Sequence, residues 1–165
     1  MEGYAKIALR MSTHPDLAIF RRFEAINAQN MLYMQAELVH LEFELHQLAE
    51  SDAKTDNANR RLYSRDWYTL SHANPADGGD DTQWRLFMTI REKLKEYNEA
   101  LAQQALISKL QAPRRHDLDT LCSCLDDPAL PDYLLGKDSS VWKTANPRTE
   151  LVSLHPVYEF DHVSL

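Results

Sequence analysis

Residues 31–48 read MLYMQAELVHLEFELHQL, and their apolar residues follow a helical repeat. The repeat comprises Met31, Met34, Leu38, Leu41, Leu45 and Leu48. Spacings that alternate between 3 and 4 keep these side chains in one stripe on one face of an α-helix. No Gly or Pro interrupts residues 16–49, and Pro15 followed by Asp16 suits a first helical turn. The pattern therefore predicts a long helix over about residues 15–49.

A second stripe with the same spacing predicts a long helix over about residues 82–110, which ends before Pro113. It comprises Phe87, Ile90, Leu94, Tyr97 and Leu101. Two matching stripes favour an antiparallel pair, in which Leu45 meets Phe87 and Leu38 meets Leu94.

The rest of the chain predicts shorter elements. Residues 51–81 contain polar and turn-forming runs around RLYSRDWYTLS, which predicts a loop with one short helix. Residues 116–126 predict another short helix, and five Pro and Gly residues predict an irregular tail over residues 128–165. A chain of 165 residues suits a single helical domain over residues 1–165. The expected fold class is all-α, a long antiparallel helical hairpin with shorter helices packed on it and an irregular C-terminal segment.

Composition narrows the possible functions. Lys and Arg total 18 against 25 Asp and Glu, so the net charge of −7 argues against a nucleic-acid partner. No apolar run approaches the ~20 residues that span a bilayer, and the amino end lacks the apolar core of a secretory signal. We therefore expect an intracellular protein, located in the cytoplasm or at the cytoplasmic face of a membrane.

The first helix carries one spacing that is used by metal sites. Glu37 and His40 form the Glu-x-x-His pair of di-metal helical bundles, but the second helix has no matching pair. Cys122 and Cys124 have the wrong spacing for a zinc or redox turn. We therefore predict no bound metal and no cofactor.

Polar residues interrupt the apolar stripes at one end of the predicted hairpin. The set comprises Glu24, Asn27, Asn30, Gln104 and Ser108. A hydrogen-bonded polar layer would fix the register of the helix pair, as single buried amides do in coiled coils. Alternatively, the set lines a small ligand-binding pocket, in which Glu24 is the weak candidate for a catalytic base.

Arginines occur in small clusters despite the acidic balance. Those with candidate roles in contact with an anionic surface are Arg21, Arg22, Arg60, Arg61 and Arg65. Such local basic patches bind anionic lipids or acidic proteins, and the alternative is pairing with acids of the same chain.

Several runs of the sequence look familiar together, namely PDLAIFRRF and LYMQAEL within residues 3–45, followed by SRDWYTLS, QWRLFMTIREKLKEYNEALAQQ and ELVSLHP. In these runs the chain resembles a fungal helical family that is recorded as a domain of unknown function. Members of that family generally continue into apolar, membrane-spanning helices, whereas this chain ends at Leu165 without one. The resemblance implies a helical fold and a membrane-associated protein, and it supplies no catalytic residues.

Two functional hypotheses follow. The first is a non-enzymatic helical interaction module, the soluble part of a membrane-associated or signalling protein. It would bind a protein partner, self-associate, or contact an anionic membrane surface. The alternative is a small helical enzyme or ligand-binding protein with a polar pocket near Glu24 and Asn27.

Overall fold

The computed structural model describes residues 3–127 and 134–155, and this part of the chain is mainly helical. Its contacts divide the chain into two compact units, where the sequence analysis expected one domain. The first unit combines residues 1–24 with residues 105–165, and the second comprises residues 25–104. We describe each unit by itself.

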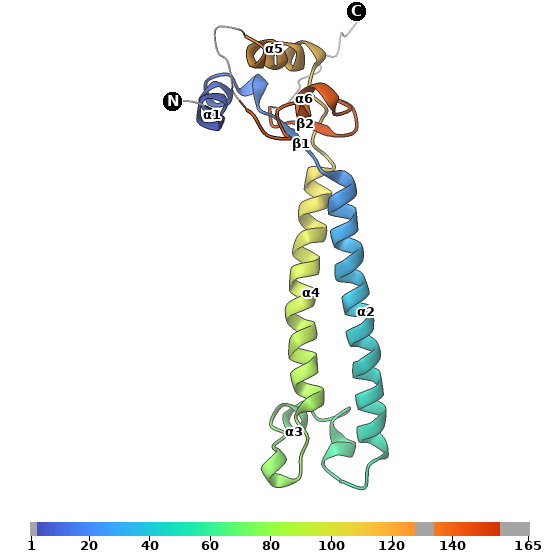
Figure 1. Ribbon diagram of the computed structural model, residues 1–165. Helices are drawn as coiled ribbons and strands as arrows, with labels where there is room; N and C mark the ends of the chain where they lie inside the picture. The colour runs from blue at the N-terminus through green and yellow to red at the C-terminus, as the bar shows by residue number, and fades with distance from the viewer. Residues whose placement is uncertain (1–2, 128–133, 156–165) are drawn as a thin grey trace, which may run out of the picture. The chain divides into compact units, whose positions relative to one another are not determined.

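The second unit is built on α2 (Glu24–Lys54) and α4 (Thr82–Ile107), which run antiparallel in Figure 1. At 1.5 Å per residue, the 31 residues of α2 span about 46 Å and the 26 residues of α4 about 39 Å. Lys93 Nζ lies 3.3 Å from Glu37 Oε1 and joins the two helices. The all-α class and the long helix pair that the stripes predicted are thus confirmed.

The segment between the long helices contains three short elements. They are the 3₁₀ turn η2 (Arg60–Leu62), the helix α3 (Trp67–Ser71) and the 3₁₀ turn η3 (Pro75–Asp77). Asp66 caps α3, because its side chain accepts a hydrogen bond from the Tyr68 amide at 3.1 Å. The sequence predicted one short helix in this loop, which corresponds to α3.

The first long helix does not begin at Pro15, as the sequence predicted. Pro15 instead starts the 3₁₀ turn η1 (Pro15–Leu17), and the strand β1 (Ile19–Arg21) follows it. Phe23 then adopts a φ of 51°, a left-handed conformation that a helix cannot include. The extended strand and this residue place the start of the helix at Glu24.

The helix also ends later than predicted, at Lys54 rather than near Ala49. Its last turns include Asp52, which is 3% exposed and receives hydrogen bonds from Arg60. The Asp52–Arg60 ion pair stabilises the helical conformation of residues 51–54, although their polar sequence is typical of a loop.

The first unit has its own hydrophobic core. Its buried residues are Leu17, Ile19, Leu118, Leu121 and Leu151. Leu118 and Leu121 come from α5 (Arg115–Leu125), which agrees with the short helix predicted over residues 116–126. The indole nitrogen of Trp142 donates to the Ile19 carbonyl at 2.9 Å, so α6 (Val141–Thr144) is tied to β1.

The predicted irregular tail supplies a strand to this core. In the described part of the tail, β2 (Leu151–Ser153) pairs antiparallel with β1, with Ile19 opposite Ser153 and Arg21 opposite Leu151. The helix α1 (Tyr4–Thr13), which the sequence analysis did not predict, buries Ile7. Across the described residues, no helix is both long and apolar enough to cross a membrane.

Candidate functional site

The apolar seam between α2 and α4 is incompletely buried. Among the described residues of α2, the single buried one is Asp52, and the leucines and methionines of the predicted stripe are half-buried. On α4, Ile90 is buried, but Leu94 and Leu101 remain 42% and 44% exposed. Two helices alone cannot surround an apolar stripe, so the hairpin keeps part of its seam in contact with water.

A groove of about 320 Å³ follows the seam along one face of the hairpin. Apolar side chains of both helices line it, namely Leu38, Val39, Leu45, Phe87, Ile90, Leu94 and Tyr97. Gln35 and Glu42 are the polar members of the lining. The lining contains the predicted opposites Leu45 and Phe87 as well as Leu38 and Leu94, which the sequence analysis expected to meet in a closed contact rather than beside a groove.

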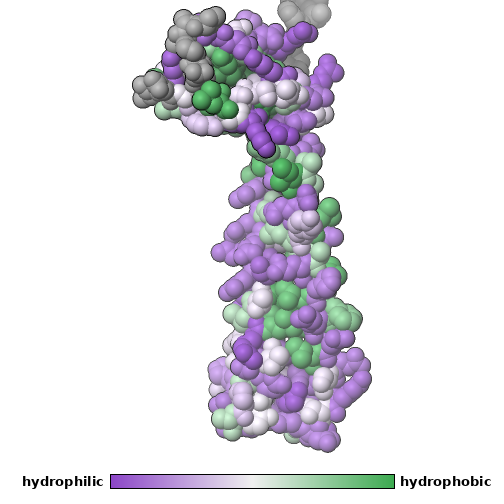
Figure 2. All heavy atoms as spheres, viewed as in Figure 1, coloured by the Kyte–Doolittle hydropathy of each residue, from purple (hydrophilic) through white to green (hydrophobic). Residues whose placement is uncertain are grey.

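A second apolar stripe lies on the outer side of α2. It consists of Leu32, Ala36, Val39 and Phe43, at spacings of 4, 3 and 4, and we call it the outer stripe. Leu32, Val39 and Phe43 are 61%, 53% and 62% exposed. At 100° per residue, the outer stripe lies about 150° around the helix from the seam. Figure 2 shows green hydrophobic residues on the surface of the hairpin among purple polar ones.

Aromatic side chains gather on α3 and at the start of α4. Trp84 lies 6.4 Å from Trp67 and 6.2 Å from Phe87, measured between ring centroids, and the Arg91 guanidinium lies 5.6 Å above both Trp84 and Phe87. Trp67 is 64% exposed. The sequence analysis expected the shorter helices to pack on the hairpin, and the structure leaves the Trp67 and Tyr68 rings of α3 largely exposed.

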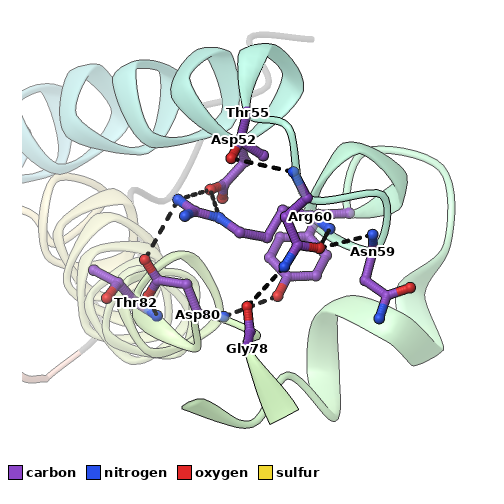
Figure 3. A network of polar contacts seen from close by, with 9 residues as sticks. Asp52, Thr55, Asn59, Arg60, Gly78, Asp80 and Thr82 are labelled. Carbon is purple, nitrogen blue, oxygen red and sulfur yellow. Dashed lines mark hydrogen bonds and ion pairs between the residues drawn. The ribbon is translucent and has the colours of Figure 1, made fainter. Parts of the chain in front are cut away.

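An ion-pair network closes the end of the hairpin near the loop (Figure 3). Arg60 donates from Nε to Asp52 Oδ1 at 2.8 Å and from Nη2 to the same atom at 2.5 Å. Arg60 Nη2 also lies 3.5 Å from Asp80 Oδ2. The hydrogen bond with Asp52 raises the pKa of Arg60, so the guanidinium stays charged. Asp52 stands four residues after Leu48, in the register of the seam, and the apolar stripe therefore ends on a buried charge pair.

The loop packs on this network. The Tyr63 hydroxyl, from a residue that is 4% exposed, accepts a hydrogen bond from the Asp80 amide at 3.0 Å. Asp80 Oδ1 accepts from the Thr82 amide at 2.9 Å, and the hydrogen bonds from Thr82 lower the pKa of Asp80. A side chain on Gly79 would come within 2.9 Å of the Asn74 backbone, so this close approach requires glycine.

The residues predicted to form a polar layer are mostly at the surface. Glu24, Asn30 and Ser108 are exposed, and Asn27 and Gln104 are half-buried. Asn30 Nδ2 lies 3.6 Å from Met34 Sδ, and the Ser108 hydroxyl donates to the Ala105 carbonyl at 2.9 Å. These contacts are local to each helix, and a ligand-binding role for the set stays a prediction.

The arginines proposed for an anionic surface have different environments. Arg60 is committed to Asp52 and Asp80, Arg21 lies 3.1 Å from Glu150, and Arg22 donates to the Leu110 carbonyl at 2.9 Å. Arg61 and Arg65 are exposed. The predicted contact with an anionic surface is untested, and the geometry leaves Arg61 and Arg65 as its most accessible members.

The residues with metal-like spacing are used in other ways. Glu37 pairs with Lys93, and His40 Nδ1 lies 2.9 Å from the Ala36 carbonyl oxygen. Cys122 and Cys124 are free thiols, and burial raises the pKa of Cys122. Within residues 3–127 and 134–155, no group of three or more His, Cys, Asp or Glu residues is arranged to hold a metal ion.

A polar pocket of about 300 Å³ in the first unit was not predicted. Arg10, His14, Asp16, His116, Asp117, Thr120 and Cys124 line it together with Leu17. Its charges are mixed in sign, and Asp16 already lies 3.3 Å from His155 Nδ1. The residues come from α1, η1 and α5, which are distant in the sequence, so no local motif could have revealed the pocket.

Comparison with known proteins places the chain in a family. No curated protein matches it, and no solved structure does. The model of a family described as "Family of unknown function (DUF6594)" matches residues 4–164. Because this match covers nearly the whole chain, the protein belongs to the DUF6594 family.

Proposed function

We propose that the protein is a non-enzymatic interaction module that binds another protein through the α2–α4 hairpin. The observation that carries the proposal is the exposed apolar surface formed by the groove and the outer stripe. Contiguous apolar surface with polar surroundings is typical of protein-binding sites, whereas single exposed apolar residues are ordinary.

The position of this surface on regular helices supports the same conclusion. The outer stripe repeats at helical spacing over three turns of α2, and Val39 belongs both to it and to the groove. An apolar helix face of this kind binds a complementary helix or groove of a partner. The alternative, a ligand pocket near Glu24 and Asn27, has less support, since Glu24 is exposed and Asn27 is half-buried.

We propose that the protein acts inside the cell, in the cytoplasm or at the cytoplasmic face of a membrane. Its two cysteines are free thiols, which is usual in reducing compartments.

The test replaces two residues of the outer stripe. The double variant Val39→Glu/Phe43→Glu should keep the helix content of the wild type, because both side chains are largely exposed and Glu is a good helix former. In a native extract of cells that produce it, the wild-type chain should migrate in a complex heavier than 19.1 kDa, and the variant should shift to a smaller size.

Leu9→Glu is the matched control, because Leu9 is 53% exposed on α1, which belongs to the first unit. This variant should remain in the complex. A wild-type chain that migrates alone in the extract would refute the proposed function.

A further inference from the structure

We propose that the protein covering the hairpin is a second copy of this chain, and that the two hairpins form a two-fold symmetric four-helix bundle. This inference rests on the proposed function, since it names the partner of the same surface. It is argued from the shape, the charge and the size of the hairpin.

The hairpin carries two surfaces that could fit each other, the outer stripe and the groove. The outer stripe projects from α2 over residues 32–43, and the α2 wall of the groove spans residues 35–45. The outer stripe and the α2 wall of the groove thus overlap along the length of one helix, and Val39 belongs to both.

A two-fold axis would allow each copy to cover the outer stripe and the groove of the other copy. In an isologous dimer, the same surface of each copy meets the other, so a patch must be complementary to itself. An axis perpendicular to α2 near Val39 would place the outer stripe of each copy in the groove of the other. Leu32 and Phe43 would then leave water together with the exposed parts of Phe87 and Leu94, which are 36% and 42% exposed.

The charges of the two helices favour this pairing. From Glu24 to Ala53, α2 contains six acidic residues and neither Lys nor Arg. α4 contains the four basic residues Arg85, Arg91, Lys93 and Lys95 and the three acidic residues Glu92, Glu96 and Glu99, so it is far less acidic than α2. An outer stripe seated in the groove brings the acidic α2 of one copy against the α4 of the other, and complementary potentials of this kind favour association and fix register.

Arg91 is the basic residue of α4 that is best placed to contact the acidic α2 of a second copy. It lies above Phe87, which lines the groove, and its guanidinium forms no ion pair among the described residues. The side chain is exposed, so a second copy would find it available.

The size of the surface also fits a partner with two helices. A helix about 10 Å wide and 40 Å long presents a strip of about 400 Å², so the hairpin offers about 800 Å² on one face. A stable interface covers about 800 Å² on each partner. A second hairpin matches that area.

The experiment measures the mass of the purified full chain by sedimentation equilibrium over a wide concentration range. The wild type should approach twice 19.1 kDa. Val39→Glu/Phe43→Glu should weaken the dimer by about 100-fold or more, because it places charges in a desolvated contact. Arg91→Glu should weaken it about 10-fold, while Leu9→Glu should leave it unchanged.

The outcomes separate this inference from the proposed function. A purified wild type that stays monomeric, while the extract complex persists, would overturn the second copy as the partner and leave the proposed function standing. A purified dimer that Val39→Glu/Phe43→Glu does not weaken, with circular dichroism showing that the variant is folded, would overturn the proposed surface. Loss of the extract complex and of the purified dimer in the double variant alone would support both.

Discussion

At the scale of single residues, the Asp52–Arg60 ion pair lies at the end of the apolar stripe of the hairpin, where Asp52 is buried. Asp52 occupies a position in the helical repeat where an apolar residue is expected. Its side chain is 5% exposed. Such pairs fix which residues face one another more than they add stability. The sequence shows a polar run, SDAKTDNANRR, and gives no sign that one of its acids is buried.

Arg60→Ala should destabilise the hairpin by about 3 kcal/mol, because the substitution leaves the Asp52 carboxylate buried without its partner. Urea unfolding followed by circular dichroism measures the change. Lys54→Ala is the control, since Lys54 pairs with Glu50 at an exposed site, where such pairs contribute little to stability. Equal effects of the two substitutions would contradict a structural role for the buried pair.

Asp80 makes the stability of the loop depend on pH. Its folded pKa lies below 3.8, the ordinary value of an aspartate, first because of the hydrogen bonds from Thr82. A depressed carboxyl pKa contributes stability that is fully present above 3.8 and is lost as the pH falls through the lower folded value. Thr82→Val should bring the Asp80 pKa closer to 3.8, as measured by an NMR titration of its carboxyl carbon. The backbone amide of residue 82 keeps its hydrogen bond in this variant, so an unchanged titration would show that the Thr82 hydroxyl is not a cause.

At the scale of elements, hydrophobic periodicity located α2, α4 and α5 because each keeps an apolar stripe of its own. The same method missed β1 and β2. Each strand is three residues long, and Ile19 pairs with Ser153, which is 134 residues away in the chain. Nothing local to either segment specifies that pairing. The left-handed Phe23, which separates β1 from α2, is equally invisible, because Phe is not a residue that favours this conformation.

The hydrophobic repeat also predicted a more deeply buried seam than the structure shows. Substitutions in the seam should therefore cost less stability than substitutions in the core of the first unit. Leu121→Ala in α5 should cost about 3 kcal/mol, because Leu121 is 1% exposed in a closed core. Leu38→Ala should cost about 1 kcal/mol in dilute protein, because Leu38 is half-buried beside the open groove. Native-state hydrogen exchange, measured separately for the amides of α2 and α5, provides both values. Similar costs at the two sites would mean that the seam is as closed as the core.

At the scale of the whole molecule, the sequence predicted the helix class but neither the two units nor the candidate site. A stripe of leucines indicates which face of a helix is apolar, and it does not say whether the partner on that face belongs to the same chain. The outer stripe of α2 was overlooked for this reason. Leu32, Val39 and Phe43 alternate with the seam residues, and together they make α2 apolar on two faces, one more than a two-helix hairpin can cover.

If the outer stripe of α2 is the dimer contact, Val39 should lie close to the two-fold axis of the dimer. Residues near a two-fold axis lie close to their own symmetry mates, so Val39→Cys should cross-link two copies when treated with a short bis-maleimide. The substitution is made with Cys122→Ser and Cys124→Ser, which removes the native thiols. Glu44→Cys in the same background is the control, because Glu44 is exposed on α2 about 120° away from the outer stripe. Covalent dimers from Val39→Cys but not from Glu44→Cys would place the axis at the outer stripe, and equal yields from both would exclude it.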